Sequence, residues 1–235
     1  MKKMLLLIIL LFTAAAISGS AAADTDPETL ILEADSEYFS KAGFVQKFDK
    51  SQGYMNDLSG DEILHQFAVQ NGAAVETLTA LQPLETAVRA VNKLLQFMDY
   101  RAKVFHASIS LQQEETIPEG SGRCWLLYSD AAVTGAGNES GVILYPGEKA
   151  YSFTKQKGEA VYNEIADLGG VDPSQKTKID VIRLDGISYF YFDGSFAFRY
   201  EDGIPNPVSF EAGTQLNEGG NRIRCNFDDF TYRKQ

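Results

Sequence analysis

The stretch Lys178–Gly194, KIDVIRLDGISYFYFDG, decides the fold of this chain. It contains Asp185-Gly186 and Asp193-Gly194, two dipeptides typical of two-residue hairpin turns, because Asp and Gly both accept a positive φ there. The residues between the turns are mostly β-branched or aromatic, which favours strands. We therefore predict that Ile179–Tyr200 is a three-stranded antiparallel meander.

Two-residue turns fix the register of this meander, so that Leu184 faces Ile187 and Tyr191 faces Phe196. One face then carries Ile182, Tyr189, Tyr191, Phe196 and Phe198 together with Asp180, and the other carries Ile179, Val181, Phe190, Phe192 and Ala197. Both faces are apolar, which is expected of a central sheet covered on both sides, or of a sheet with one face turned to a ligand.

Further strands are expected on both sides of the meander. The range 62–79 is predicted to be a hairpin around Asn71-Gly72, and the range 222–232 alternates as a closing strand. The other expected strands are 100–111, 124–129 and 141–145, with 151–153 and 162–165 as weaker candidates. The range 83–95 places apolar residues at helical spacing, so we expect a short helix there in preference to a loop and strand. The predicted fold class is all-β: a two-sheet antiparallel sandwich with one short helix.

The first residues of the chain are typical of an export signal. Lys2 and Lys3 precede an uncharged apolar run, and small residues end in Ala21-Ala22-Ala23, which fits a cleavage site before Asp24. The apolar run is shorter than the about 20 residues that span a bilayer. We predict that residues 1–23 are a cleaved signal peptide, that 24–235 form one domain without a membrane span, and that the protein is secreted or periplasmic.

Charge and cysteine usage limit the partners and the redox state. Without the two signal-peptide lysines, 19 basic and 32 acidic residues remain, a net charge of −13. No Lys/Arg cluster is present, so we do not expect nucleic acid as a partner, whereas neutral polysaccharides, basic proteins and Ca²⁺ stay open. Because exported proteins meet an oxidising environment, we expect Cys124 and Cys225 to form a disulfide.

Three segments together resemble the concanavalin-A-like lectin/glucanase superfamily, in particular its laminin-G-like or keto-disaccharide-hydrolase-like exported bacterial domains. They are GRCWLLYSD (Gly122–Asp130), the KIDVIRLDGISYFYFDG stretch and FDDF (Phe227–Phe230). The resemblance covers about the second half of the chain. It implies a curved jelly roll of two antiparallel sheets, whose members often bind glycans on the concave face and in some cases hold Ca²⁺ at a rim.

The candidate ligand-binding residues are aromatic side chains beside polar ones, since rings stack on sugar C–H faces while polar groups bind hydroxyls. Trp125, the sole tryptophan, alternates with Cys124 and so points to the opposite face of its sheet. Tyr189 and Tyr191 share a face with Asp180 and form a predicted platform. The alternative interpretation is that all four residues only pack in the core.

No catalytic or metal-binding pattern emerges from the residues. The resemblance implies that a glycosidase of this superfamily carries two glutamates and an aspartate at alternating positions of one strand. No such run occurs in this sequence. His65 and His106 are the only histidines, too few for a typical zinc site. Calcium stays open, with Asp228, Asp229 and the loop 135–139 as candidate ligands, and no other cofactor is expected.

The sequence therefore favours an exported, non-catalytic carbohydrate-binding or surface-interaction module. Two alternatives are kept. One is a glycosidase-like or keto-sugar hydrolase whose acidic residues come from separate loops, and the other is a structural cell-envelope module that binds a protein partner.

Overall fold

The protein was analysed as a computed structural model that describes residues 26–35, 44–46, 55–56, 63–96, 104–131, 137–145, 150–156, 159–164 and 174–234. These residues form one α-helix and fifteen strands, which are α2 (Pro27–Asp35), β1 (Phe44–Gln46), β2 (Met55–Asn56), β3 (Ile63–Gln70), β4 (Ala73–Ala80), β5 (Val88–Gln96), β6 (Phe105–Ile117), β7 (Gly122–Ser129), β8 (Glu139–Leu144), β9 (Ala150–Gln156), β10 (Glu159–Glu164), β11 (Thr177–Leu184), β12 (Ile187–Phe192), β13 (Ser195–Glu201), β14 (Ser209–Leu216) and β15 (Arg222–Lys234). Within these ranges, no helix has the length and apolar character needed to cross a membrane. The predicted signal peptide lies outside the described residues.

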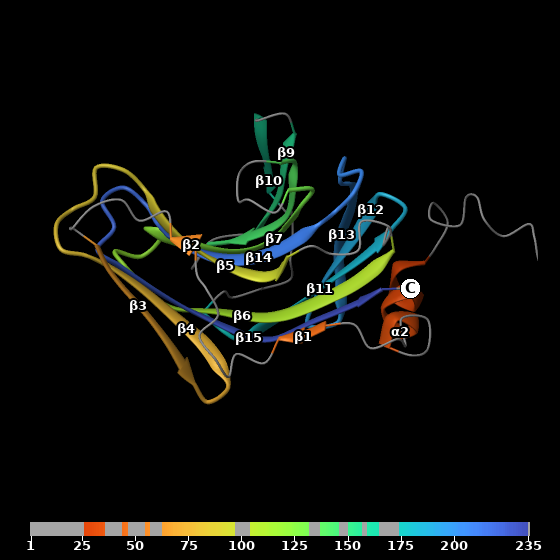
Figure 1. Ribbon diagram of the computed structural model, residues 1–235, viewed down its shortest axis with the longest axis horizontal. Helices are drawn as coiled ribbons and strands as arrows, with labels where there is room; N and C mark the ends of the chain where they lie inside the picture. The colour runs from red at the N-terminus through yellow and green to blue at the C-terminus, as the bar shows by residue number, and fades with distance from the viewer. Residues whose placement is uncertain are drawn as a thin grey trace, which may run out of the picture.

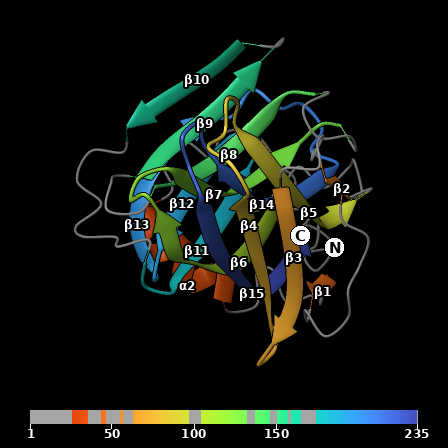
Figure 2. The ribbon, with the colours of Figure 1, turned by 90° about the vertical axis from the view of Figure 1, so that its left-hand side faces the viewer.

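The strands form two antiparallel sheets stacked face to face (Figure 1). Sheet A has the order β13-β12-β11-β6-β15-β4-β3, with β1 also paired to β15, and sheet B has the order β10-β9-β8-β7-β14-β5-β2. Seen from the side of the β3–β4 hairpin, β9 and β10 lie at one edge of sheet B (Figure 2). The predicted all-β, two-sheet sandwich is confirmed.

The meander forms at the predicted turns. Asp185 and Asp193 have φ of 46° and 50°, each followed by a glycine of positive φ, so left-handed backbone joins β11, β12 and β13. The register is also as predicted, with Leu184 opposite Ile187 and Tyr191 opposite Phe196. One side chain differs: a bulge at Phe190/Tyr191 pairs Phe190 with Phe198, and Phe198 therefore packs against the inner core instead of beside Tyr191.

The inner faces of the sheets bury one continuous apolar core. β15 lies between β6 and β4 in sheet A, and its Ile223, Cys225 and Phe227 point into this core. From β6, Phe105, Ala107, Ile109 and Leu111 join them, as the alternation predicts. A slip of one residue in β15 would turn Arg222 and Arg224 into this core, so the hydrophobic pattern strongly specifies its register.

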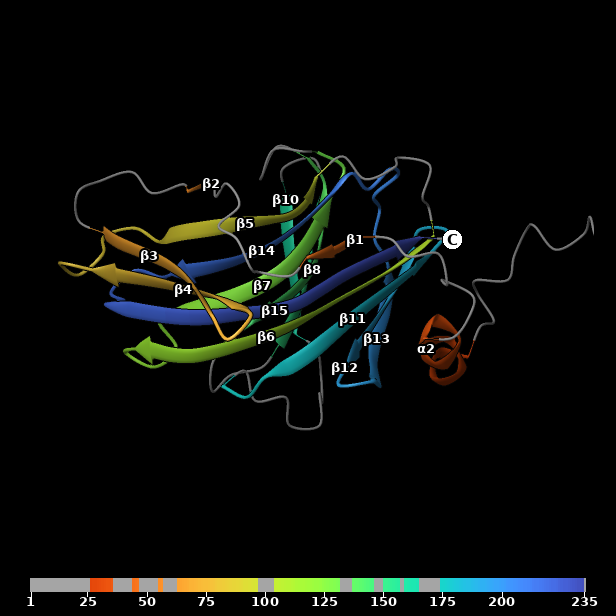
Figure 3. The same cartoon turned by 60° about the horizontal axis from the view of Figure 1, so that its bottom comes forward.

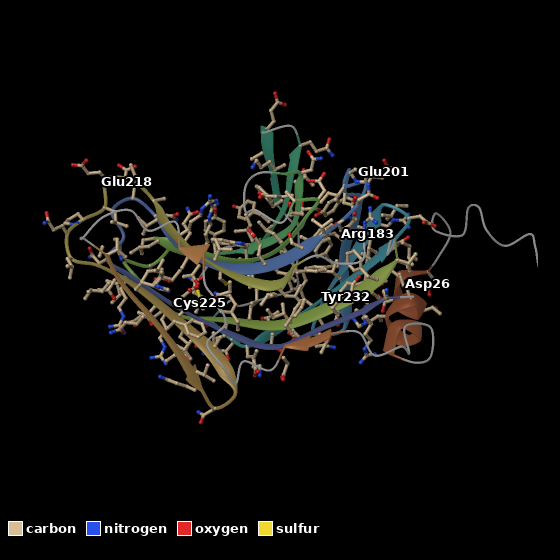
Figure 4. The ribbon with its side chains drawn as sticks, viewed as in Figure 1. Asp26, Arg183, Glu201, Glu218, Cys225 and Tyr232 are labelled. Carbon is tan, nitrogen blue, oxygen red and sulfur yellow. The ribbon has the colours of Figure 1, made fainter. Side chains whose placement is uncertain are left out.

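The predicted disulfide is not formed in this structure. Cys124 and Cys225 are both free thiols, fully buried, and they approach each other from β7 of sheet B and β15 of sheet A. Figure 4 shows Cys225 between the sheets. Burial, together with the neighbouring Cys124 thiol, raises the pKa of the Cys225 thiol. The prediction from the oxidising compartment therefore named two thiols that meet between the sheets, but they are not covalently bonded.

The predicted helix at 83–95 is wrong, and the helix of the described residues lies elsewhere. Val88–Gln96 is strand β5, which pairs with β14. Its Ala90 and Leu94 face the inner core, while Val91 faces outward. The helix is α2, which begins after Asp26. The Asp26 carboxylate accepts a hydrogen bond from the Thr29 hydroxyl (2.7 Å), and Pro27 occupies the first helical position.

Asp202, which follows β13, connects the two sheets through a buried carboxylate. Its Oδ2 accepts hydrogen bonds from Arg183 Nε (2.6 Å), from the Tyr128 hydroxyl of sheet B (2.9 Å) and from the Ser188 hydroxyl (3.0 Å). Its Oδ1 accepts one from the Ile204 amide (2.8 Å). Burial raises the pKa of Tyr128, so this hydroxyl stays neutral and able to donate. A carboxylate with 1% of its residue surface exposed thus has its charge balanced and its oxygens satisfied.

We predict that Asp202→Ala lowers the free energy of unfolding by about 3–5 kcal/mol, because it removes the carboxylate that balances the charge of the buried Arg183 guanidinium. The neighbouring exposed residue provides the control, and Glu201→Ala should change stability by less than about 0.5 kcal/mol. Urea unfolding of both variants measures the difference. Equal losses in the two variants would contradict the assigned role of Asp202.

Candidate functional site

The outer face of sheet B is the candidate site. Figure 1 shows β9 and β10 rising steeply from the plane of β5, β14 and β7, so this face of the sheet is concave. We call it the concave face, and its side chains include Val91, Arg123, Trp125, Leu127, Glu139, Ile143, Tyr145, Tyr151, Phe153, Lys155, Glu211 and Gln215. Strand alternation points these side chains away from the inner core.

Trp125 lies at the centre of this face, on the side opposite to Cys124, as the alternation predicts. Its ring lies flat over Gly213 of β14, where an added Cβ would come within 2.1 Å of the indole. Val91, Ile143 and Phe153 pack around it, and only 4% of the residue is exposed. The indole Nε1 is a buried donor without a hydrogen-bond partner. Trp125 is therefore a floor of the concave face, not the exposed ring that the sequence suggested.

Beside Trp125, residues of β7, β9 and β14 and Tyr145, which follows β8, form a polar and aromatic group. Arg123 donates to the Tyr145 hydroxyl (2.7 Å) and to Gln215 Oε1 (2.9 Å). The Tyr145 ring meets the Tyr151 ring edge-on, with centroids 5.4 Å apart. All four side chains are partly exposed. Sequence reasoning missed Arg123, Tyr145, Tyr151 and Gln215, although Arg123 shares the alternation of Trp125.

Two carboxylates also face the concave side. Strand β8 turns Glu139, Gly141 and Ile143 outward, and β14 turns Glu211, Gly213 and Gln215 outward, so each strand carries one carboxylate. With β7 between them and a two-residue offset, strand spacings place the Glu139 and Glu211 Cα atoms about 12 Å apart. Neither strand has the alternating carboxylates of the glycosidase arrangement described above.

The predicted platform of Tyr189, Tyr191 and Asp180 lies on the other sheet, on the outer face of sheet A. All three residues are fully buried there, because α2 packs against this face (Figure 3). Leu30 and Ile31 of α2 contact the aromatic cluster, and the Tyr191 hydroxyl donates to the Pro27 carbonyl (2.8 Å). The shared face is confirmed, but the open platform is not, because a helix distant in the sequence covers it.

Asp180 instead holds a buried histidine. His106 Nε2 lies 2.8 Å from Asp180 Oδ1, and Lys178 Nζ lies 3.2 Å from Oδ2. Burial raises the pKa of Asp180, but the hydrogen bond and charge of His106, together with Lys178, outweigh it, so the pKa is lowered below the ordinary value of 3.8. His65 likewise contacts a buried carboxylate, that of Glu76 (3.0 Å). Both histidines have structural partners.

The candidate calcium ligands do not converge. Asp228 lies on β15 of sheet A and pairs with Lys176, whereas Glu139 lies on β8 of sheet B. Asp229 sits at a bulge in β15 with φ of 53°. Over the described ranges, no three His, Cys, Asp or Glu side chains gather in a way that holds a metal ion. Residues 135–136 of the candidate loop lie outside these ranges.

No protein-family profile matches the sequence, and no curated protein is similar to it. Solved structures do match the fold. A β-glucanase of Bacillus licheniformis superposes with a TM-score of 0.58 at 10% identity, over 83% of this chain and 100% of that chain. This fold is a concanavalin-A-like jelly roll.

Other structures share the jelly roll. A β-1,3-1,4-glucanase (lichenase) from a mouse hindgut metagenome has a TM-score of 0.56 at 12% identity, over 82% of this chain and 99% of that chain. A carbohydrate-binding module from Bacillus subtilis has a TM-score of 0.50 at 12% identity, over 77% of this chain and 96% of that chain. At such identities the likeness shows the fold alone.

We predict that Gly213→Ala displaces the Trp125 ring, because the new methyl group occupies the space of the indole. Overpacking of this kind lowers the free energy of unfolding by about 1–3 kcal/mol. The emission of the sole tryptophan should also shift to longer wavelength as the ring gains water contact. Gln66→Ala, an exposed change on β3, should alter neither quantity. Unchanged emission in Gly213→Ala would contradict the assigned position of Trp125.

The lowered pKa of Asp180 predicts a pH dependence of stability. A carboxylate whose pKa is lower in the folded chain stabilises fully above its unfolded value, and this contribution is lost as pH falls through the folded value. Asp180→Asn should therefore be less stable than the wild type at pH 6, and the gap should narrow below about pH 4. Thermal unfolding across this range measures the gap. Asp185→Asn, in an exposed turn, should show no stability difference from the wild type at any of these pH values. A stability difference for Asp180→Asn that does not change with pH would contradict the prediction.

Proposed function

We propose that the protein is an exported glycan-binding module that holds a polysaccharide on the concave face of sheet B and does not cleave it. The single observation that carries this proposal is the group of Arg123, Tyr145, Tyr151 and Gln215 beside the Trp125 floor. Such a group combines ring faces and edges with hydroxyl, guanidinium and amide groups on one curved surface. This combination suits sugars, whose rings are apolar on one face and carry hydroxyls at the edge.

Preorganisation supports binding at this face. The hydrogen bonds of Arg123 to Tyr145 and Gln215 fix three side chains before any ligand arrives, so less side-chain entropy is lost on binding. The indole Nε1 of Trp125 supplies a buried donor that the protein leaves without a partner. Two of the solved structures that share the jelly roll are named as glucanases and one as a carbohydrate-binding module, which agrees with a carbohydrate-related role.

The distribution of carboxylates supports binding over cleavage. Hydrolysis of a glycosidic bond uses two carboxyl groups about 5–5.5 Å apart for retention, or about 6.5–9.5 Å apart for inversion. Glu139 and Glu211 sit on different strands, unlike the carboxylates that alternate along one strand in the glycosidase arrangement described above. Both are also nearly buried, and Glu139 lies 3.8 Å from Lys155, which ties it to a neighbouring strand.

The hydrolase alternative rests on the same two residues, because they are the carboxylates of the described concave face and both approach it from separate strands. Export, with release of residues 1–23, belongs to the proposal as well and follows from the basic start, the apolar run and the Ala21–Ala23 site. A secreted or periplasmic location brings the concave face into contact with extracellular or envelope glycans.

The test is a panel of insoluble and soluble polysaccharides incubated with residues 24–235, with and without Ca²⁺, scored for retained protein and for released sugars. We expect retention without release on at least one polysaccharide. Arg123→Ala should weaken retention about tenfold or more, since it removes two hydrogen bonds and the support of Tyr145. Arg199→Ala, an exposed arginine on sheet A, is the matched control and should retain normally.

Three results would change the interpretation. Released sugars, abolished by Glu211→Gln or Glu139→Gln, would overturn the non-catalytic part and favour the hydrolase. Retention that survives Arg123→Ala and Tyr151→Ala would place the binding surface elsewhere. No retention on any polysaccharide would overturn the glycan proposal and make a protein partner the better target.

A further inference from the structure

We infer that the outer face of sheet A carries a second binding site, for a small neutral polyhydroxylated ligand such as a single sugar ring. The site is a pocket of about 280 Å³ over β4, β15 and β6, closed at one end by the β3–β4 turn and at another by Lys176 before β11. We call it the sheet A pocket. Figure 3 shows these strands side by side, with α2 over the opposite end of the same sheet. It lies on the other sheet from the concave face and uses none of the residues proposed there.

The strand register gathers side-chain amides in this pocket. Asn226 of β15 stands opposite Gln112 of β6 on one side and opposite Val75 of β4 on the other. Gln70, at the end of β3, reaches the same pocket and lies 3.4 Å from the Arg224 guanidinium. Every second residue of a strand points to the outer face, so Gln112 of β6, Asn226 of β15 and Gln70 of β3 are presented on the same side of sheet A, with β4 between β15 and β3.

The charges in the pocket cancel. Arg224 Nε lies 2.6 Å from Glu114 Oε2, and Lys176 pairs with Asp228. These four side chains are partly exposed, so each pair contributes little to stability, but the pairing leaves no net charge for an ionic ligand to balance. A charged ligand such as a phosphate, a carboxylate or a cation is attracted by one member of each ion pair and repelled by the other, so it gains no net electrostatic attraction here.

The amides instead present donors and acceptors together. The Asn226 Nδ2 group donates to Glu114 Oε1 and approaches Gln112 Oε1 at 3.4 Å, while Gln112 Nε2 donates to the Ser174 carbonyl (2.8 Å). These contacts fix the orientation of both amides. Asn226 Oδ1 is then a buried acceptor without a hydrogen-bond partner, a group that native structures satisfy with a ligand or water. A hydroxyl donates to such an oxygen and accepts from a neighbouring amide or ammonium.

Size and floor narrow the ligand class. Typical ligand pockets hold about 300–1,000 Å³, so this smaller pocket suits one ring and not an extended chain. Ala73 and Val75 also line it and offer apolar contact to ring C–H groups. The pocket therefore combines an apolar floor with oriented amides and balanced charges, which together select for a neutral ring with several hydroxyls.

The test uses residues 24–235 labelled with ¹⁵N and follows the side-chain amide signals of Asn226 and Gln112 by NMR. The probes are glucose, galactose, mannose and N-acetylglucosamine, with glucuronate and glucosamine as charged comparisons. We expect at least one neutral sugar to shift both signals in a saturable way. Asn226→Ala and, separately, Gln112→Ala should weaken that binding about five- to tenfold, which corresponds to the loss of one or two hydrogen bonds.

Two controls separate this site from the concave face. Gln66→Ala, on the same outer face of sheet A but outside the pocket, should leave the affinity unchanged, and so should Arg123→Ala. If no neutral sugar shifts the two signals, if a charged probe binds better than every neutral one, or if binding survives Asn226→Ala, the inference is overturned. Loss of polysaccharide retention in Arg123→Ala with intact amide shifts would show that the two sites are independent.

Discussion

The buried carboxylate of Asp202 is the interaction on which the geometry of both sheets depends. A charge removed from water must be matched by donors, and here Arg183 and Ser188 come from sheet A while Tyr128 comes from sheet B. Figure 4 shows Arg183 close to the end of the sandwich where β11–β13 meet the curled part of sheet B. Each donor has to be within about 3 Å of the same two oxygens, so the distance between the sheets is fixed at this end. At the other end, the interior contains Cys124, Cys225 and the buried Glu76, which hydrogen-bonds with Asn92 and lies 3.0 Å from His65.

The inner faces of both sheets form this core, whereas their outer faces carry different kinds of side chain. The outer face of sheet A is apolar under α2, where Tyr189 and Tyr191 are buried, and polar over β4, β15 and β6. The outer face of sheet B curves and carries aromatic and polar side chains around Trp125. Gly213 is central to that arrangement, because only a residue without a side chain lets the indole lie flat on the strand. The shape of the concave face therefore depends on the packing of the Trp125 ring against Gly213 of β14.

The parts of the fold that local rules control could be predicted from the sequence. The Asp-Gly turns fix the register of the strands beside them, so the pairing of Leu184 with Ile187 was predictable. The inner face of β6 was predictable from its alternation of apolar and polar residues. Phe198 was assigned to the wrong face because a bulge in the β12–β13 pair leaves no signal in the alternation. The range 83–95 has helical spacing, but pairing of β5 with β14 overrides it. Helix α2 was not predicted, and neither was its docking on Tyr191, which lies 164 residues from Pro27 in the sequence. For the same reason the group around Arg123 was not predicted, since its members come from three strands and from Tyr145 after β8.

The central claim is that a glycan binds on the concave face beside Trp125. Trp125 is the sole tryptophan of the chain, so its fluorescence reports on that face alone. The most direct measurement is the emission of residues 24–235 during titration with a polysaccharide that retains the protein. The account predicts a saturable change in intensity or wavelength that Arg123→Ala weakens and Arg199→Ala leaves intact. Retention of the protein without any change in tryptophan emission would contradict it, because the ligand would then be bound away from the concave face.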